Sequence, residues 1–331
     1  MINKFNKSKI RSLAAIFAAS FVLTGCSGAS AGIDTRMLFH SKDANTGYET
    51  NIVSNPVYAD FVTAKICAVS FENAKMEDAN IPAKAAIMVD VTNNELVFAK
   101  NVYERIYPAS TTKMLTALMV LKYGELTDEI TIRDDNMGIT TPGAKLCGFK
   151  QGDILTVDTL LNSLMIYSGN DAAIALAEYI SGSEENFCEL MNEEAKKLGA
   201  VDTHFVNAHG LHNDEHYTTA YDMYLIFMEC LKYDSFRDII NQASYHAVYQ
   251  NSEGVKKEYT FKNTNQFLIG TSEVPEGITV FGGKTGSTSY AGDCLMIYSE
   301  NSDNTGYITG VFKASAKDSL YNQMSYLLMR Q

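Results

Sequence analysis

The sequence predicts an α+β fold in which a single sheet, made from distant segments of the chain, is covered by helices. Strand-like runs occur near both ends of a domain that begins at about residue 80, and helix-like runs fill its middle. Between residues 80 and 331 there is no second linker, internal repeat or low-complexity segment, so one domain accounts for this length. Strands at both ends of a helical middle favour one sheet with helices packed on it.

The first 25 residues have the composition of a signal peptide. Residues 1–11 contain four basic residues and no acid, and residues 12–25 are apolar or small, interrupted only by Ser and Thr. This run is shorter than the roughly 20 apolar residues of a transmembrane helix. It ends in Leu23-Thr24-Gly25-Cys26, which resembles the bacterial lipobox. The resemblance implies lipid attached to Cys26 at the outer face of the cytoplasmic membrane, and the alternative is an ordinary secretory signal with a chance cysteine.

Charge and cysteine content exclude several other classes of protein. Removal of residues 1–25 leaves 23 basic and 39 acidic residues, a net charge of −16 against −12 for the whole chain. Such a negative protein is not expected to bind nucleic acid. Without any CxxC pair, the cysteines after Cys26 indicate neither a disulfide framework nor a zinc site. Buried free thiols are favoured over one or two bridges for these five residues: Cys67, Cys147, Cys188, Cys230 and Cys294.

Residues 26–79 are expected to form a stalk between the lipid and the domain at residues 80–331. The composition of the stalk is mixed and shows no sustained periodicity. Its portion from Phe61 to Phe71 is apolar enough to pack on the domain as a strand.

The strand signals are runs of apolar residues separated by turn-forming residues. The apolar runs 85–91 and 95–99 flank Asn93-Asn94, which predicts a hairpin. Near the other end of the domain, Gly, Ser and Asn separate three further strand-like runs at residues 278–281, 293–298 and 307–312.

Helix signals occupy the middle of the domain. Each of these segments has apolar residues at helical spacing, and most have a capping residue before them or a glycine after them. The expected helices are residues 111–122 before Gly124, 157–166 after Thr156, 171–180 before Gly182, a helix capped by Ser183 that ends before Gly199, a fifth near residues 219–233, and one near the C-terminus at 317–331.

The first candidate for chemistry is Ser110-Thr111-Thr112-Lys113, where a lysine follows a serine by one helical turn on the same face. Pro108 suits the start of a helix, and residues 114–121 are apolar nearly all round, so this helix must be buried. A lysine at the start of a buried helix loses solvation, which lowers its pKa and allows it to act as a base near pH 7. Taken alone, the pattern is weak, because a solvated helix start would look the same.

Two further motifs strengthen the first. Ser168-Gly169-Asn170 lies between two expected helices, where a tight turn can direct a hydroxyl and an amide to one place. Lys284-Thr285-Gly286 follows a strand-like run, and this combination suits a strand edge that binds a carboxylate.

In the order Ser-x-x-Lys, Ser-x-Asn, Lys-Thr-Gly, these motifs are the set associated with penicillin-binding proteins and β-lactamases. Over about residues 81–315 the chain most resembles the low-molecular-mass D-alanyl-D-alanine carboxypeptidases, with further similarity at Tyr107-Pro108-Ala109 and His209-Gly210-Leu211. The resemblance implies a fold of the DD-peptidase and β-lactamase type, with an antiparallel sheet flanked by helices. It also implies removal of the terminal D-alanine from peptidoglycan stem peptides, β-lactam antibiotics as covalent inhibitors, and no cofactor.

The resemblance further implies a role for each matching residue. Ser110 would form the acyl-enzyme after Lys113 takes its proton, and Ser168 would relay a proton to the leaving D-alanine. The substrate would be bound by a further set of residues: Asn170 along its backbone, Lys284 and Thr285 at its terminal carboxylate, Gly286 in the strand edge, and the backbone N–H groups of Ser110 and Ser287 at the oxyanion.

After the Lys-Thr-Gly motif and its strands, only residues 317–331 remain. The all-β second domain and the amphipathic C-terminal anchor of many relatives are therefore expected to be absent, with the lipid at Cys26 as the anchor instead.

Four alternatives stay open. His209, His212 and His216 have spacings that could suggest a metal site, but Gly210 and Asn213 make a continuous helix doubtful, and no metal is expected. The same motifs could serve a D,D-endopeptidase or a non-catalytic lipoprotein that binds stem peptides. A β-lactamase needs an additional glutamate, and Glu189-Leu190-Met191-Asn192 is only superficially similar because it lies inside an expected helix.

Overall fold

The computed structural model describes residues 66–331. The predicted signal peptide, the lipid attachment at Cys26 and most of the predicted stalk lie outside the described residues. In the described part, residues 66–79 pack on the domain, and Cys67, Val69 and Ala74 belong to its main hydrophobic core.

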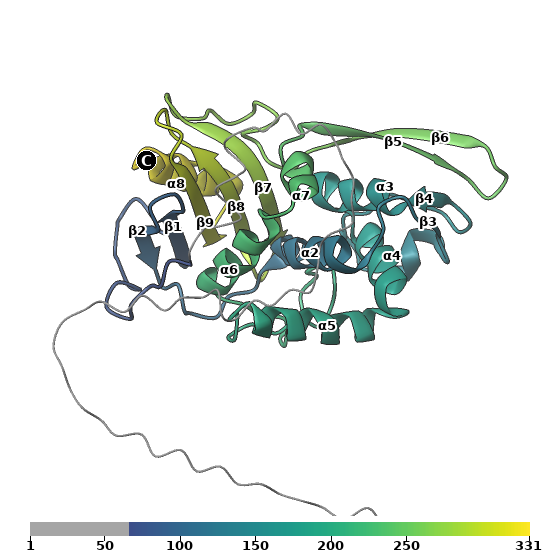
Figure 1. The fold of residues 1–331 in the computed structure, drawn as a ribbon, viewed down its shortest axis with the longest axis horizontal. Helices are drawn as coiled ribbons and strands as arrows, with labels where there is room; N and C mark the ends of the chain where they lie inside the picture. Colours follow the sequence, from purple (N-terminus) through teal and green to yellow (C-terminus); the bar gives the residue numbers. More distant parts are fainter. Residues whose placement is uncertain (1–65) are drawn as a thin grey trace, which may run out of the picture. The chain divides into compact units, whose positions relative to one another are not determined.

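An antiparallel sheet of five strands brings the two ends of the domain together (Figure 1). Its strand order is β2-β1-β9-β8-β7, so the N-terminal hairpin pairs with the last strand and β7 lies at one edge. This arrangement confirms the prediction of a sheet made from distant segments. The strands are β1 Ala85–Asp90, β2 Glu95–Lys100, β7 Thr279–Thr288, β8 Gly292–Glu300 and β9 Gly306–Ala314.

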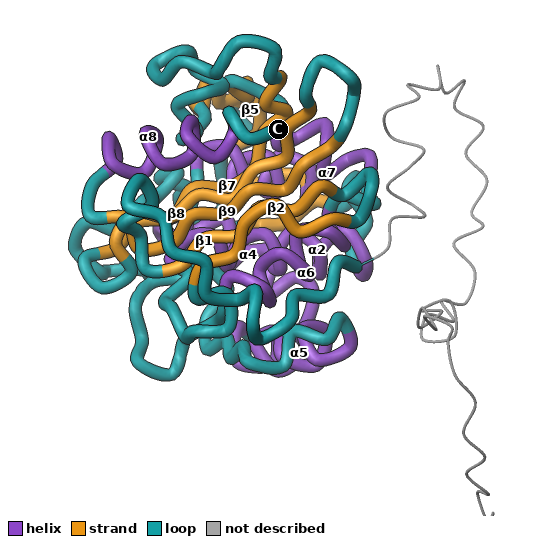
Figure 2. The backbone as a smooth tube through the Cα atoms, turned by 90° about the vertical axis from the view of Figure 1, so that its left-hand side faces the viewer, coloured by secondary structure: helices purple, strands orange, loops and turns teal. Residues whose placement is uncertain are grey.

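Both faces of the sheet are covered, which explains why β1 is a continuous apolar run. Ala85, Ile87 and Val89 belong to the main core, whereas Ala86 and Met88 belong to a second cluster. Helix α8 (Lys317–Leu328) packs on the face of the second cluster, and α2 and α6 lie on the opposite face (Figure 2). The fold is therefore α+β, with an antiparallel sheet between helices.

The helical part is built around α2 (Lys113–Tyr123), whose first eight residues are all buried. The predicted caps Thr156 and Ser183 are present, because each accepts a hydrogen bond from the backbone N–H three residues later, and Thr219, which was not predicted as a cap, does the same for α6. Helix α7 was not predicted. The remaining helical segments are η3 Ala109–Thr112, η4 Asp135–Gly138, α3 Val157–Asn162, the π-helix η5 Ser163–Tyr167, α4 Asn170–Ser181, α5 Glu184–Lys197, α6 Ala220–Cys230 and α7 Asp234–Ile240.

The expectation of a single sheet was wrong, since a second, four-stranded sheet has the order β3-β4-β5-β6. Strands β3 and β4 have only three residues each, and β6 is exposed except at Phe261, so these three carry little signal in the sequence. Strand β5 does alternate, with Tyr245, Ala247 and Tyr249 on its inner side, and this signal was overlooked. Strands β5 and β6 form a hairpin that projects beyond the helices (Figure 1). The strands are β3 Glu129–Thr131, β4 Ile154–Thr156, β5 Ser244–Gln250 and β6 Lys256–Lys262.

A strand at Phe61–Phe71 was also expected, but the described part of that range, residues 66–71, contains none. Tyrosine side chains take the place of a neighbouring strand. The hydroxyl of Tyr224 accepts a hydrogen bond from the N–H of Cys67 at 3.0 Å, and the hydroxyl of Tyr221 donates to the Cys67 carbonyl at 3.1 Å. These bonds satisfy buried backbone groups without a sheet.

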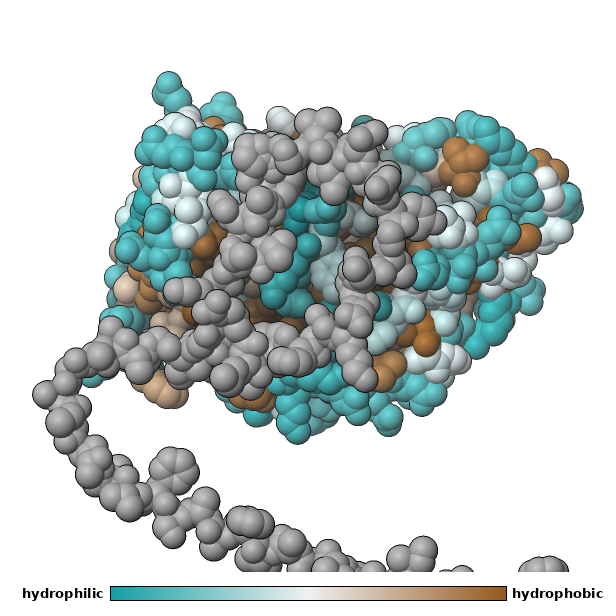
Figure 3. Space-filling model, viewed as in Figure 1, coloured by the Kyte–Doolittle hydropathy of each residue, from teal (hydrophilic) through white to brown (hydrophobic). Residues whose placement is uncertain are grey.

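All five cysteines within residues 66–331 are free, and every one except Cys147 is buried. No helix in the range has the length and apolar character needed to cross a membrane. The face of the domain drawn in Figure 3 carries scattered hydrophobic patches on a largely hydrophilic surface.

Candidate active site

Ser110 and Lys113 lie at the junction of η3 and α2, with the lysine one turn after the serine. Pro108 precedes η3 in a helical conformation, and Ala109 adopts a φ of 48° that turns the chain into the helix. The Nζ of Lys113 lies 3.1 Å from the Oγ of Ser110. The spacing of the motif therefore produces a direct contact between the hydroxyl and the amine.

The side chain of Lys113 is completely buried, and its Nζ has two oxygen partners besides Ser110. It donates to Asn170 Oδ1 at 2.6 Å and to the His209 carbonyl at 2.5 Å. Burial lowers the pKa of Lys113 to about 7, and the more distant Cys147 and Asp171 oppose this shift only in part. Lys113 is thus held in a position where it can lose its proton near neutral pH.

The Ser168-Gly169-Asn170 turn lies between the π-helix η5 and helix α4. Ser168 ends η5 with a left-handed φ of 73°, and Asn170 begins α4. Ser168 Oγ accepts a hydrogen bond from Lys284 Nζ at 3.0 Å, while Asn170 bonds Lys113. A single turn therefore connects the two buried lysines of the site.

Asp171, a fully buried residue that the sequence-based reasoning did not select, fixes this turn. Its carboxylate accepts hydrogen bonds from the backbone N–H groups of Cys147 and Gly148, each at 2.9 Å. The same segment accepts a bond from the N–H of Asn170 through the Lys145 carbonyl at 2.8 Å. Residues 145–148 thus hold the start of α4 in place.

The Lys-Thr-Gly motif lies on the edge strand β7, directly against η3. Lys284 is buried, and burial lowers its pKa well below the usual value, with Lys113 as the next cause. Thr285 Oγ1 lies 2.6 Å from Thr264 Oγ1, a partner that no sequence signal indicated. Ser287 is exposed and pairs with Asp293 of β8.

Gly286 allows β7 to approach the serine. A Cβ at this position would lie 2.9 Å from both the Pro108 carbonyl oxygen and the Ser110 backbone nitrogen. Contacts this short would force the strand and η3 apart. The glycine of the motif therefore has a steric function that its position in the sequence did not reveal.

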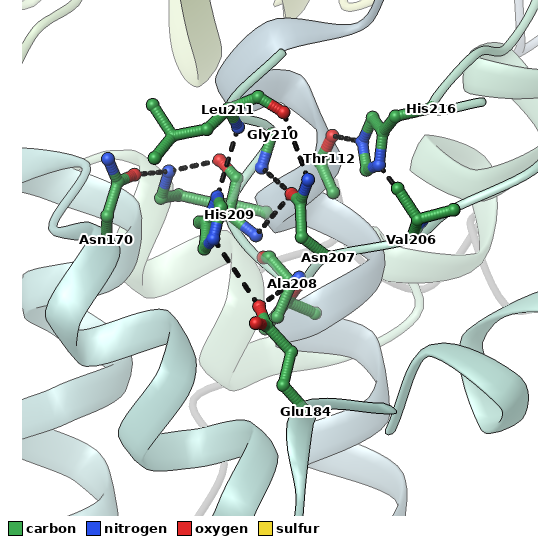
Figure 4. A network of polar contacts seen from close by, with 12 residues as sticks. Thr112, Asn170, Glu184, Val206, Asn207, Ala208, His209, Gly210, Leu211 and His216 are labelled. Carbon is green, nitrogen blue, oxygen red and sulfur yellow. Dashed lines mark hydrogen bonds and ion pairs between the residues drawn. The ribbon is translucent and has the colours of Figure 1, made fainter. Parts of the chain in front are cut away.

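The loop at residues 207–211 lies beside Asn170 (Figure 4), and its His209 carbonyl accepts the hydrogen bond from Lys113 Nζ. Asn207 Oδ1 accepts hydrogen bonds from the N–H groups of His209 at 3.3 Å and Gly210 at 2.6 Å, and Asn207 Nδ2 donates to the Leu211 carbonyl at 3.0 Å. Gly210 has a φ of 85°, and a Cβ there would lie 1.9 Å from the Ala109 carbonyl oxygen. Glycine is required for the loop to lie against the residue before Ser110.

Glu184 at the start of α5 holds this loop from another side (Figure 4). Its Oε1 accepts a hydrogen bond from the N–H of Ala208 at 2.9 Å and lies 3.5 Å from His209 Nε2. Burial, with Lys113 as the next cause, lowers the pKa of His209 to about 3, so the ring is neutral and the contact with Glu184 is not an ion pair. These contacts fix the His209 carbonyl that accepts from Lys113.

The three histidines that suggested a metal site have different neighbours. His209 faces Glu184, His216 Nε2 lies 2.8 Å from Thr112 Oγ1, and His212 stacks on Tyr290. Within residues 66–331 there is no group of three or more His, Cys, Asp or Glu side chains placed to hold a metal ion.

The site as a whole combines a nucleophile, a base and a place for an anion. All the predicted site residues except Cys26 lie in the described part of the chain, and the three motifs meet where η3, the Ser168 turn and β7 come together. Neither Lys113 nor Lys284 forms an ion pair with a carboxylate of residues 66–331. A hydroxyl beside a neutral amine can attack a carbonyl, and an unpaired cation nearby can bind a carboxylate.

Comparison with known proteins identifies relatives over most of the chain. Residues 72–316 match a protein family described as D-alanyl-D-alanine carboxypeptidase. The D-alanyl-D-alanine carboxypeptidase DacF of Bacillus subtilis is 34% identical over 251 residues, which cover 74% of this chain and 61% of DacF. DacC of Escherichia coli, with the same description, is 33% identical over 69% of this chain and 56% of its own length. The chain thus spans about three fifths of the length of these relatives.

Solved structures of the same kind are similar in fold. The Streptomyces K15 DD-transpeptidase superposes with a TM-score of 0.71 and 26% identity, covering 77% of this chain and 98% of that one. Penicillin-binding protein 5 from Haemophilus influenzae has a TM-score of 0.67 and 29% identity, covering 77% of this chain and 72% of that one. The predicted fold class is confirmed by these similarities.

We expect Lys113 to lose its proton near pH 7, because burial stabilises the neutral amine, whereas lysine in an unfolded chain does so near pH 10.4. Heteronuclear NMR of the lysine side chains, with Lys113→Met to assign the signal, measures the midpoint. A Lys113 midpoint within one unit of 10.4 would contradict this expectation.

The sign of the accompanying effect on stability follows from linkage. Above about pH 7 the native Lys113 has released its proton, while the unfolded chain keeps it up to about pH 10.4. Between about pH 7 and pH 10.4 the unfolded state therefore binds more protons than the native state. Because of Lys113, the free energy of unfolding is expected to rise with pH across this range.

Proposed function

We propose, from the premise that this chain belongs to the D-alanyl-D-alanine carboxypeptidase family, that it is a serine-type carboxypeptidase that removes the terminal D-alanine from peptidoglycan stem pentapeptides. The observation that carries the proposal is the contact of 3.1 Å between Ser110 Oγ and the Nζ of the buried Lys113. The pKa of about 7 leaves a large fraction of this amine free to accept a proton at neutral pH.

Acylation follows from this geometry. Neutral Lys113 takes the hydroxyl proton of Ser110 while Ser110 Oγ forms a bond to the carbonyl carbon of the penultimate D-alanine. The resulting oxyanion would accept hydrogen bonds from the backbone N–H groups of Ser110 and Ser287, which lie on the two elements that Gly286 brings together. The peptide C–N bond then breaks, and the leaving amine receives the proton that Lys113 took from Ser110, relayed through the Ser168 hydroxyl, so that Lys113 is neutral again. The Ser168 hydroxyl also contacts Lys284.

Deacylation reverses the roles with water as the nucleophile. Water replaces the departed D-alanine, Lys113 accepts its proton, and the ester bond to Ser110 breaks so that the hydroxyl is restored. Asn170 would orient the substrate backbone while its Oδ1 holds Lys113 Nζ at 2.6 Å. Besides water and the backbone N–H of Ser287, the cycle uses only groups of the three motifs.

Recognition of the chain end is assigned to Lys284 and Thr285. Lys284 has no carboxylate partner among residues 66–331, and its bonds to Ser168 Oγ and the Thr285 carbonyl, each 3.0 Å, hold its amino group at the strand edge. A terminal carboxylate bound there would restore a favourable environment for a buried cation. This requirement for a free carboxylate distinguishes a carboxypeptidase from an endopeptidase.

Two alternatives are less well supported. A β-lactamase needs an additional base for fast deacylation, but Glu189 is exposed on α5, and the neighbouring Asn192 bonds the backbone N–H and carbonyl of Phe205, each at 2.8 Å. A lipoprotein that only binds stem peptides would not require a buried lysine against a serine hydroxyl.

β-Lactam antibiotics are proposed to acylate Ser110 as covalent inhibitors.

The proposed place of action is the outer face of the cytoplasmic membrane, where stem peptides are accessible. Anchoring by lipid at Cys26 is supported by the Leu23-Thr24-Gly25-Cys26 sequence after a basic and then apolar leader. Residues 1–25 are proposed to be removed as a signal peptide. The segment after Cys26, up to residue 65, would connect the lipid to the domain.

Ser110→Ala is expected to abolish both penicillin labelling and D-alanine release, with rates at least about three orders of magnitude below wild type, because the covalent nucleophile is lost. Lys113→Ala should be nearly as damaging, since the hydroxyl then keeps its proton. Mass spectrometry of the penicillin adduct and an assay of D-alanine release measure both effects.

Ser302→Ala provides the matched control, because Ser302 is exposed in the turn between β8 and β9, and β8 ends there opposite Thr279, at the other end of β7 from the Lys-Thr-Gly motif. It should label and hydrolyse like wild type. Circular dichroism should show that Ser110→Ala is folded, since the Ser110 side chain caps no helix. A folded Ser110→Ala protein with wild-type D-alanine release would refute the assignment of the nucleophile.

Cys26→Ala is expected to release the protein from membranes, because the thiol that would carry the lipid is missing. Detergent partitioning and mass spectrometry of the N-terminal peptide, after expression of the full chain in a bacterium, measure anchoring. The control is Cys67→Ala, which removes a thiol within the folded domain. Equal membrane association of Cys26→Ala and wild type would rule out the lipid anchor.

A further inference from the structure

Three aromatic side chains that the proposed reaction does not use gather at the end of β7. Tyr290, in the turn between β7 and β8, stacks on His212 with ring centroids 3.7 Å apart and an interplanar angle of 6°. Tyr107 supports His212 edge-on at 4.7 Å. Tyr290 keeps 57% of its surface exposed, so an open aromatic face is built into the site's border.

The position of Tyr290, just after the end of β7, determines which part of a substrate its ring can reach. A peptide that adds antiparallel to the edge strand, with its carboxylate at Lys284 and Thr285, has its reacting carbonyl opposite Ser287. Each residue further from the C-terminus advances about 3.3 Å along the strand. The penultimate D-alanine therefore lies beside Thr288, and the residue before it reaches the turn that carries Tyr290.

The chemistry of this border suits an alkyl chain with a terminal ammonium. The face of a tyrosine ring packs against methylene groups and attracts a cation. Asp214 places a carboxylate at the same border. Its Oδ1 lies 3.3 Å from His212 Nε2, and its side chain is 87% exposed. No lysine or arginine among residues 66–331 pairs with Asp214, so the carboxylate stays available to a ligand.

We propose that Tyr290, held flat by His212, binds the side chain of a diamino acid that directly precedes the two terminal D-alanines and recognises its free amino group. This subsite rests on the proposed carboxypeptidase function and on the strand direction that it sets. A free amine gains the attraction of the ring and of Asp214, whereas an acylated amine has lost its charge. The enzyme then distinguishes stem peptides whose side-chain amine is free from those in which it has been acylated in a cross-link.

Two peptides that differ mainly in that charge test the subsite. The probes are Nα-acetyl-L-lysyl-D-alanyl-D-alanine and its Nα,Nε-diacetyl form, and the readout is the ratio of their kcat/KM values for D-alanine release. Wild type is expected to favour the free amine about fivefold, the range of a cation over a partly exposed ring. In Tyr290→Ala the ratio should fall close to one, and in Tyr290→Phe, which keeps the ring, it should persist.

Tyr123→Ala is the matched control, because Tyr123 is similarly exposed and lies at the end of α2 opposite to Lys113, and the ratio for this variant should equal that of wild type. Wild type that cleaves both peptides equally well, or Tyr290→Ala that keeps the fivefold ratio, would overturn the subsite and leave the carboxypeptidase intact. Wild type that releases D-alanine from neither peptide would overturn the proposed function and the subsite with it.

Discussion

The burial of two lysine side chains, neither of which has an acidic partner within the described residues 66–331, is the constraint on which the site depends. Lys113 and Lys284 are each about 99% or more buried, and desolvation disfavours their charged forms. A carboxylate beside Lys113 would restore its charge and remove its use as a base. The protein satisfies its Nζ instead with neutral oxygens, from Ser110, Asn170 and the His209 carbonyl.

The surrounding fold can be understood as the means of placing these oxygens. Asp171 fixes the turn that carries Asn170, and Glu184 fixes the loop that carries the His209 carbonyl. Two glycines, Gly210 and Gly286, let the loop and the edge strand lie against η3 at distances that a Cβ would prevent. Rigid placement of this kind is what preorganised catalysis requires, because misplacement of the base by about 1 Å is costly in rate.

The sequence predicted the features that depend on local patterns. The Lys113 contact and its role as a base follow from helical spacing and burial, and the capping by Ser183 from its place before the helix, whereas the roles of Ser168, Asn170 and Ser287 came only from a resemblance to known enzymes. Features that depend on packing between distant segments were missed. Nothing near Glu184 distinguishes it from an ordinary acidic residue at a helix start, and nothing near Thr264 indicates its contact with Thr285. Strand β6 was missed because all of its side chains except Phe261 are exposed, whereas β5 carries an alternation of Tyr245, Ala247 and Tyr249 that the prediction overlooked.

The central claim is that the buried Lys284, which has no carboxylate partner among residues 66–331, binds the terminal carboxylate of the substrate while Ser110 attacks beside it. The most direct test compares D-alanine release from a stem pentapeptide with hydrolysis of the same peptide carrying a C-terminal amide. The account predicts efficient release from the free acid and a loss of at least about tenfold for the amide, because the charge-assisted bond to Lys284 is missing. Equal cleavage of the acid and the amide would contradict it.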